Sequence, residues 1–447
     1  MSPRLYKIYK KFWYIKGTFR ARFTPSGRLI LLFLITSAVF GINIQRTMIY
    51  QMFCPLAALL FLAWLFSLRF HTSVTIRRLL PETCTAGQEL RYRLELSNNG
   101  SRSEQGLFFR EELTNPLPSF AEFANTPEDG EEKRNWFDRR AGYYRWLWLI
   151  GKNRGAEPGH HPLPAVDSEG TSHMVEITPL RRGYIHFSGY RIFRHDPLGL
   201  LAASVPFQSR DNLLVLPKIY PLPSFLFHGS RKYQQGGIAA ALKNGDSTEF
   251  MGLREYRHGD PVKHIDWKSS ARTCQTVVRE YQDEYFSRYG LVLDTFSPRS
   301  HSQVFEEAVS VAASIFMTGS TGDGILDLLF VGPESVISSS GPGIAEQQHM
   351  LEILASVATC RDKPFAELAS LLKGHLGLLS GLAIIFIDMD RQRKELLDFL
   401  SSLKIPFTAM MVVDDREKGL KKLAAEKVTL PVTLLTVGEI ERDLSTL

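Results

Sequence analysis

Acidic residues are missing from the first 81 positions of this 447-residue chain. That segment carries 12 Lys and Arg residues before the first acidic residue, Glu82, so its net charge is +12. The remainder carries 41 basic and 47 acidic residues, a net charge of −6. A nucleic-acid-binding protein would usually carry its basic patch on the folded body. Here the positive charge surrounds the most hydrophobic part of the chain, which favours lipid headgroups over nucleic acid as the acidic partner.

Cysteine is also scarce. The four residues Cys54, Cys84, Cys274 and Cys360 form no CxxC pair and no zinc-type spacing with histidine. We therefore predict four free thiols, as is usual in a reducing compartment. No GxxxxGK[ST] motif is present, so the sequence does not support nucleotide hydrolysis by a P-loop.

Two apolar runs without charged residues, 29–45 and 47–68, flank Arg46. A membrane-spanning helix needs about 20 apolar residues, with a range of about 17–25, so the second run qualifies and the first is at the lower limit. A cleaved signal peptide is the alternative, but a second and longer apolar segment follows the first. We predict a transmembrane helical hairpin at 29–69 after a basic segment at 1–28.

The basic residues around these runs are distributed unevenly. Residues 1–28 carry eight Lys and Arg, the connection carries only Arg46, and Arg69, Arg77 and Arg78 follow the second run. Positively charged flanks stay on the cytoplasmic side of a membrane. The sequence thus predicts a multi-pass protein with both termini in the cytoplasm.

Residues 72–215 have the pattern of a small antiparallel β-sandwich. Apolar residues alternate with polar ones over 90–96, the period of a half-buried strand. Further predicted strands lie at 107–113, 174–180, 184–193 and 212–219, separated by Gly, Pro and Asn.

A polar insertion at about 125–173 interrupts this domain and carries an aromatic run with nearby basic residues at 136–154. Two interpretations stay open: the aromatic side chains lie in a membrane interface, or they form a hairpin that is buried on the sandwich.

From residue 285 to 447 the pattern becomes α/β. Apolar runs typical of buried strands lie at 290–294, 325–331, 383–388, 407–413 and 431–437. Helical periodicity separates them at 304–317, 344–358, 364–373, 391–403 and 416–425. This alternation predicts a doubly wound parallel sheet covered on both faces. Ligands bind such sheets beyond the carboxyl ends of the strands, where Asp294, Asp388 and Asp414 fall.

A long motif occupies part of the segment 216–284. It runs Arg-x-Tyr-x-x-Gly-Asp, then Ile-x-Trp-Lys-x-x-Ala-Arg, then Arg-Glu and an acidic residue. The matching positions are Arg254, Tyr256, Gly259, Asp260, Ile265, Trp267, Lys268, Ala271, Arg272, Arg279, Glu280 and Glu284. A second motif is Arg182-Gly183-Tyr184 followed by Asp196-Pro197-Leu198-Gly199-Leu200. Together they resemble the signature of the bacterial and archaeal "domain of unknown function 58" family.

This resemblance implies a protein anchored in the bacterial inner membrane whose last domain is von Willebrand factor A-like. Genes of the family commonly lie beside those of MoxR-type AAA+ ATPases and transglutaminase-like membrane proteins, which are therefore the partners that the resemblance implies. The resemblance transfers no particular activity to this chain, because none is settled for the family.

The first motif allows a structural and a functional interpretation. Asp260-Pro261 has the composition of a helix start, with Asp as the N-cap and Pro at the first helical position. In the structural interpretation, Arg254, Trp267 and Arg272 brace this helix, with Asp260 and Glu280 as partners. In the functional one, the motif is a docking surface for a protein, because Trp, Tyr and Arg predominate in binding hot spots. The candidate partner-binding residues are Arg254, Tyr256, Asp260, Trp267, Lys268 and Arg272.

A metal site is the other candidate. The resemblance to von Willebrand A domains implies an Asp-x-Ser-x-Ser loop after the first strand, but this chain has Phe296 and Pro298 at the two serine positions. Asp294 and Asp388 match the aspartates, and Ser297 is the nearest hydroxyl. Such a set predicts at most weak, water-rich binding of magnesium.

The sequence therefore favours a membrane-tethered, non-enzymatic adaptor whose last domain binds a protein, and the family resemblance implies a MoxR-type AAA+ ATPase system as that partner. The alternative is a metal-dependent hydrolase that uses Asp294 and Asp388.

Overall fold

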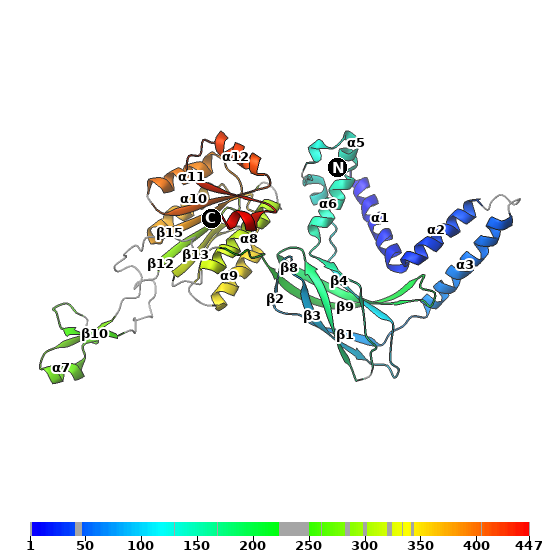
Figure 1. Cartoon of the computed structure of the whole chain (residues 1–447), viewed down its shortest axis with the longest axis horizontal. Coiled ribbons are helices and arrows are strands. Elements are labelled where there is room, and N and C mark those ends of the chain that lie inside the picture. The colour runs from blue at the N-terminus through cyan, green and yellow to red at the C-terminus, as the bar shows by residue number, and fades with distance from the viewer. Residues whose placement is uncertain are drawn as a thin grey trace. The chain divides into compact units, whose positions relative to one another are not determined.

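The computed structural model describes residues 2–40, 47–128, 130–167, 169–222, 250–260, 262–281, 287–297, 302–319, 324–332, 334–340, 344–403 and 405–446. Contacts within the chain define two compact units. One comprises Met1–Lys218 with Leu351–Ser356, and the other comprises Ile219–Met350 with Val357–Leu447. A multi-domain organisation with a β-rich part and an α/β part is thus confirmed (Figure 1).

Three helices open the first unit: α1 (Pro3–Arg22), α2 (Pro25–Phe40) and α3 (Thr47–Leu68). We predicted no secondary structure for the basic segment 1–28, and α1 occupies most of it. Its aromatic residues Tyr6, Tyr9 and Trp13 recur at helical spacing on one face. Among the described residues, one stretch, Gln51–Leu68 of α3, is long and apolar enough to cross a membrane, and α2 is a shorter apolar helix.

The two sheets of the sandwich pack face to face around a common core. In the first, the strand order is β1-β3-β7-β5, with β1 (Val74–Leu79), β3 (Leu90–Asn98), β7 (Thr171–Pro179) and β5 (Ala156–Pro158). In the second, the order is β2-β9-β8-β4-β6, with β2 (Thr83–Thr85), β9 (Ala202–Leu216), β8 (Gly183–His195), β4 (Leu107–Leu113) and β6 (His161–Pro162). The prediction of a purely antiparallel domain is wrong at one edge, because β2 pairs with β9 in parallel.

Strict alternation builds this core. In β3, every second residue from Tyr92 to Asn98 is buried, and Leu107 and Phe109 of β4 face the same interior from the other sheet. An ion pair lies inside as well: Arg78 Nε is 2.9 Å from Glu111 Oε1, which also accepts a hydrogen bond of 2.7 Å from the Tyr92 hydroxyl. Pairing of this kind is what makes buried charges tolerable.

The insertion is helical, so the predicted aromatic hairpin is wrong. It contains α5 (Trp136–Ala141) and α6 (Tyr143–Asn153), and α4 (Phe120–Asn125) and a 3₁₀ turn (Glu131–Lys133) precede them. Trp146, Leu149 and Ile150 are buried at spacings of three and four residues, as on one face of a helix. Helix α1 covers that face, with Tyr6 edge-to-face on Trp146 at a centroid distance of 5.6 Å. Trp146, Leu149 and Ile150 are thus buried within the protein, whereas Trp136 and Phe137 are exposed.

The second unit contains a six-stranded sheet with the order β14-β13-β12-β15-β16-β17. Its strands are β12 (Ser287–Leu293), β13 (Gly324–Val331), β14 (Ser335–Ser340), β15 (Gly381–Phe386), β16 (Phe407–Val413) and β17 (Val432–Thr436). All pairs are parallel except β13–β14. All six residues of β15 are buried, which requires cover on both faces.

Helices connect these strands. They are α8 (Gln303–Gly319), α9 (Ile344–Ser356), α10 (Ala366–His375), a 3₁₀ turn (Leu376–Leu378), α11 (Arg391–Ser402), α12 (Arg416–Ala425) and α13 (Ile440–Leu444). The sequence predicted five strands and five helices of this domain within a few residues. It missed β14 and α13.

Candidate functional site

The first motif of the sequence folds into a small module. Strands β10 (Phe250–Glu255) and β11 (Val277–Tyr281) form an antiparallel pair, and a 3₁₀ turn (Val262–His264) and the short helix α7 (Trp267–Thr273) connect them. The helix begins later than predicted. Asp266 is its N-cap and accepts a hydrogen bond of 3.0 Å from the Ser269 amide. The prediction that Asp260 caps this helix is wrong, and Pro261 lies outside the described residues.

Arg254 and Asp260 have a structural role within this module. The guanidinium of Arg254 donates to both oxygens of Asp260, at 2.7 and 2.9 Å, and the Arg257 amide adds a third hydrogen bond at 2.8 Å. The hydrogen bond from Arg254 lowers the pKa of Asp260 to about 2, and the bond from Arg257 acts in the same direction. Between them, Gly259 has φ = +109°, a conformation that favours glycine. These residues hold the loop before α7 in shape.

A second pairing in the module was not assigned from the sequence. Arg279 of β11 donates to Asp266 at 2.9 Å, so the residue that caps α7 is also tied to the sheet. The Ser269 amide and Arg279 both lower the pKa of Asp266. The motif contained Arg279, but nothing in the spacing indicated its partner.

The exposed face of α7 carries the remaining candidates. Trp267 is 68% exposed, and Lys268, Ala271 and Arg272 are also exposed. Trp267 and Ala271 lie on one side of the helix, and Lys268 and Arg272 lie together on the adjoining side. The bracing role suggested for Trp267 and Arg272 is therefore wrong. Tyr256 is half-buried, and its amide donates to the Thr276 carbonyl at 2.8 Å. The side chain of Glu280 lies outside the described residues.

Asp294 lies at the carboxyl end of β12, as predicted, but its carboxylate is occupied. Arg393, in the first turn of α11, approaches it with Nε 2.6 Å from Oδ2 and Nη2 3.1 Å from Oδ1. The amides of Phe296 and Ile387 donate to the same carboxylate, at 3.0 and 3.3 Å. Asp294 is fully buried. Burial raises the pKa of its carboxyl, and the positive charge of Arg393 opposes that rise.

The other metal candidates are also poorly placed. Asp388 forms an ion pair with Lys422 of α12, and Ser297 is half-buried. In the part of the chain that the structure describes, no three His, Cys, Asp or Glu side chains gather as a metal site would require. A divalent cation at Asp294 would have to displace a guanidinium that makes two hydrogen bonds there. These residues therefore do not fit a metal ion, and the hydrolase that needs one has no geometric support.

The second motif forms a tight turn between β8 and β9, here called the anchor turn (Asp196–Leu201). Asp196 is buried and accepts hydrogen bonds from the amides of Leu198, Leu200 and Leu201 at 2.9, 2.7 and 2.5 Å. The turn contacts the start of α2, where the Thr24 hydroxyl donates to the Gly199 and Leu200 carbonyls at 2.6 and 3.0 Å.

The contact of the anchor turn with α2 is close. A Cβ atom at Gly27 would lie 1.9 Å from the Leu200 carbonyl oxygen, so only glycine fits there. The second motif thus fastens the sandwich to the first apolar helix.

Comparison with known proteins places the first motif and the sheet in one family. Residues 252–433 match the model of the family described as "Protein of unknown function DUF58". This segment of the chain belongs to the DUF58 family. The match includes the module of β10, β11 and α7 and most of the six-stranded sheet.

A curated relative agrees with this assignment. The "Uncharacterized protein YeaD" of Bacillus subtilis (strain 168) is 31% identical over 187 residues, which is 41% of this chain and 45% of that protein. The chain thus aligns with less than half of the length of this DUF58 relative.

Among solved structures, the chain is compared with a GH20 exo-β-N-acetylglucosaminidase from Vibrio harveyi. The identity is 10% and the TM-score 0.14, over 80% of this chain and 60% of that chain. A similarity this low carries no argument about the fold or the activity of this chain.

Proposed function

We propose that this chain is a membrane-tethered, non-enzymatic adaptor. Helices α2 and α3 form a transmembrane hairpin in a bacterial inner membrane, with both termini in the cytoplasm. Residues 285–447 form a von Willebrand factor A-like domain, and the exposed surface of α7 binds a protein partner.

Several observations support the anchor. Helix α3 contains a stretch that is long and apolar enough to cross a bilayer, and α2, which contacts it, is mostly apolar. Many of their large apolar side chains, such as Leu32, Phe33 and Phe61, are more than half exposed, as side chains that face lipid would be. The charge of +12 before Glu82 favours the cytoplasmic side for the flanking segments.

The order and direction of the strands support an A-like domain. A parallel sheet has β12 and β15 at its centre and one antiparallel edge strand, β14. The first strand ends in Asp294, as it does in the domains that the sequence resembles. In place of a cation, however, this carboxylate binds Arg393.

The face of α7 carries the functional proposal. The polar groups of the motif that have structural roles, Arg254, Asp260, Asp266 and Arg279, are paired within the module. Trp267 is left 68% exposed, and the cationic side chains of Lys268 and Arg272 are exposed on the adjoining side of the helix. A large exposed aromatic residue with flanking positive charge is typical of a binding hot spot for an acidic protein surface.

The family resemblance names the candidate for that acidic surface. We propose a MoxR-type AAA+ ATPase of the same organism as the partner, with a transglutaminase-like membrane protein as a further member of the assembly. The partner is chosen because genes of the family lie beside those of such ATPases. The experiment below tests for direct contact between the two proteins.

The test measures the dissociation constant between the full-length protein in lipid nanodiscs and the purified ATPase. We compare the wild type with the double variant Trp267→Ala/Arg272→Ala. The matched control is Trp136→Ala/Arg139→Ala, because Trp136 is 64% exposed on another surface helix and Arg139 is exposed one turn away.

Loss of a hot-spot tryptophan and arginine costs about 2 kcal/mol or more, which weakens binding at least about 30-fold. The control variant should bind within twofold of the wild type. Equal binding by all three proteins, or no binding by the wild type, would refute the proposed docking face.

A further inference from the structure

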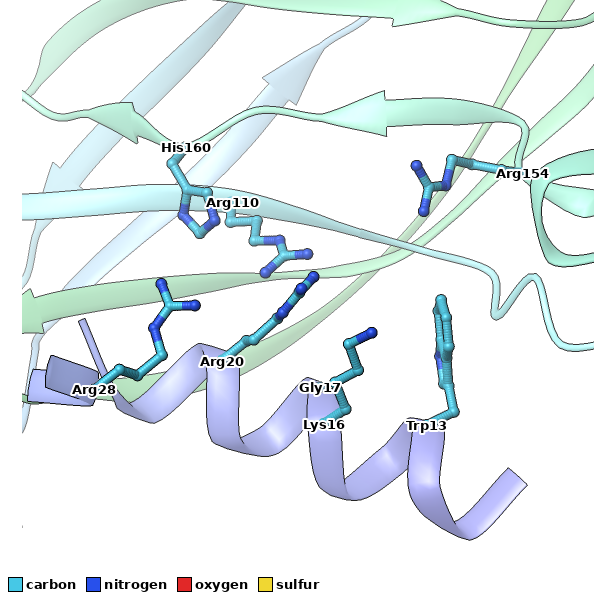
Figure 2. A pocket seen from close by; sticks show the side chains of 8 residues that line it. All are labelled: Trp13, Lys16, Gly17, Arg20, Arg28, Arg110, Arg154 and His160. Carbon is cyan, nitrogen blue, oxygen red and sulfur yellow. The ribbon is translucent and has the colours of Figure 1, made fainter. Parts of the chain in front are cut away.

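A cavity of about 500 Å³ lies in the first unit between the N-terminal helices and the sandwich. It is called the basic pocket here, and its lining residues are Trp13, Lys16, Gly17, Arg20, Arg28, Arg110, Arg154 and His160. Five of the eight carry a permanent positive charge, and none is acidic. Figure 2 shows side chains from the helices and from the sandwich pointing toward one another across this space.

Separate segments of the chain build the pocket. Lys16 and Arg20 lie one turn apart on α1, and Arg28 lies in the first turn of α2. Arg110 comes from the middle of β4, and Arg154 caps the carboxyl end of α6. The contacts of the anchor turn with Thr24 and the aromatic packing of α1 on α6 hold the two walls together. The convergence of these cations is therefore a property of the fold.

Most of these charges have no counter-charge. Within the described ranges of the chain, Lys16, Arg20 and Arg110 form no ion pair. Three nearby carboxylates have partners of their own: Glu157 lies 3.2 Å from Arg154, Glu112 lies 2.6 Å from Arg191, and Glu111 lies 2.9 Å from Arg78. Burial lowers the pKa of Arg110, the positive charges of Arg191 and Arg154 add to that effect, and the negative charge of Glu112 opposes it. An anion would relieve this repulsion.

The chemistry of the walls favours phosphate. Planar guanidinium groups form paired hydrogen bonds with phosphate oxygens, and several arginines converging on one space are typical of phosphate recognition. A volume of about 500 Å³ is within the range of small-molecule sites and accommodates a phosphate with a polar headgroup.

The location points to a lipid as one source of that phosphate. The pocket adjoins the junction of α1 and α2, where the chain passes from a basic helix into the apolar pair, and Trp13 lines its other end. If α2 and α3 span the bilayer as proposed above, the pocket lies at the level of the headgroups, where arginine and tryptophan are favoured.

We propose that the basic pocket binds a phosphate group through Lys16, Arg20, Arg28 and Arg110. Its ligand is the headgroup of an anionic phospholipid or a free phosphorylated molecule. Only the preference for a lipid over a soluble ligand rests on the proposed membrane anchor. The binding of a phosphate group rests on the residues of the pocket alone.

Native mass spectrometry of the full-length protein in neutral detergent provides the test. Phosphatidylglycerol is titrated in one arm and glycerol 3-phosphate in the other, with phosphatidylcholine as the neutral lipid. The variant is Arg20→Gln/Arg110→Gln, which removes one arginine from α1 and one from the sandwich. The matched control is Arg4→Gln/Arg77→Gln, which removes the same charge from the same two parts outside the pocket. Circular dichroism confirms that each variant is folded.

We expect the pocket variant to bind phosphatidylglycerol at least about tenfold more weakly than the wild type, because two charge-assisted contacts are lost. The control should stay within twofold. Binding of phosphatidylglycerol without binding of glycerol 3-phosphate identifies a lipid site, and the reverse identifies a site for a soluble phosphate. The proposal would be overturned if both variants lost phosphatidylglycerol binding equally. It would also be overturned if the wild type bound phosphatidylcholine as well as it binds phosphatidylglycerol.

A separate measurement tests the proposed membrane anchor independently of the phosphate site. Carbonate extraction of membranes from expressing cells reports whether the full-length protein is integral to the bilayer. If it is extracted while glycerol 3-phosphate still binds in the pocket, the anchor is wrong and the phosphate site stands.

Discussion

Replacing Arg393 with methionine removes the guanidinium from Asp294 and keeps a side chain of similar length. The carboxylate is then left fully buried with only the Phe296 and Ile387 amides as donors. Breaking a buried ion pair in this way costs about 3–5 kcal/mol, because the remaining charge has no compensation. At about 1.4 kcal/mol per factor of ten, the opening equilibrium of this domain should rise by about 10²–10⁴-fold.

Hydrogen exchange of the full-length protein, read by mass spectrometry, isolates this effect from the sandwich. Peptides covering β12, β15 and α11 should lose protection in the Arg393→Met variant, and peptides from β3 and β8 should not change. The double variant Asp294→Asn/Arg393→Met removes both charges, so it should be less destabilised than Arg393→Met alone.

The pH dependence gives an independent test of the same argument. Without Arg393, burial raises the pKa of the Asp294 carboxyl further above the unfolded value, and only the Phe296 and Ile387 amides oppose that rise. A raised acid pKa destabilises the fold when the group is ionised, and this cost disappears as the pH falls through that pKa. The difference in protection between variant and wild type should therefore shrink from pH 8 to pH 5. A difference below about tenfold at pH 8, or one that grows at low pH, would refute the reasoning.

Three further predictions concern other parts of the chain. Gly27→Ala should lower the Tm of the protein in nanodiscs by overlap with the Leu200 carbonyl, whereas Gly17→Ala, with nothing within 4 Å of its Cβ, should leave it unchanged or raise it. Trp146→Ala removes a side chain that is 2% exposed, so it should lower the free energy of unfolding by about 3–5 kcal/mol. Hydrogen exchange of α1 and α6 peptides during a urea titration measures that loss. Asp260→Asn should weaken protection in β10 at pH 7. Because the pKa of Asp260 is lowered to about 2, this stabilisation is present above its unfolded value of about 4 and is lost as the pH falls toward 2; a pH-independent effect would contradict it.

The spacing of apolar residues along the chain predicted most of the elements of the six-stranded sheet. The buried strands β12, β13, β15, β16 and β17 appear as apolar runs, and their order along the chain already indicated a parallel sheet. Strand β14 was missed because it is a serine-rich edge strand with alternate residues exposed. Helix α1 was missed because its basic residues suggested a charged tail, although its aromatic residues recur at helical spacing.

Sites that depend on distant segments were harder to predict. Asp294 was found, but Arg393 lies 99 residues later on a helix with no sequence feature that links the two. In the same way, the basic pocket brings together residues between Trp13 and His160. The structural interpretation named Asp260 among the partners of the motif residues, and its bond with Arg254 joins positions only six residues apart.

The hydrogen bond between Thr24 and the anchor turn also bears on how the protein is made. The two partners are 175 residues apart, so at about 5–20 residues per second a ribosome needs about 9–35 s to produce the second after the first. During that interval, the N-terminal helices have left the ribosome without the surface that later covers them. In the proposed topology, the bilayer receives α2 and α3 first, and the cytoplasmic sandwich closes on them afterwards. Assembly at the membrane is then an ordered process in which insertion precedes tertiary docking.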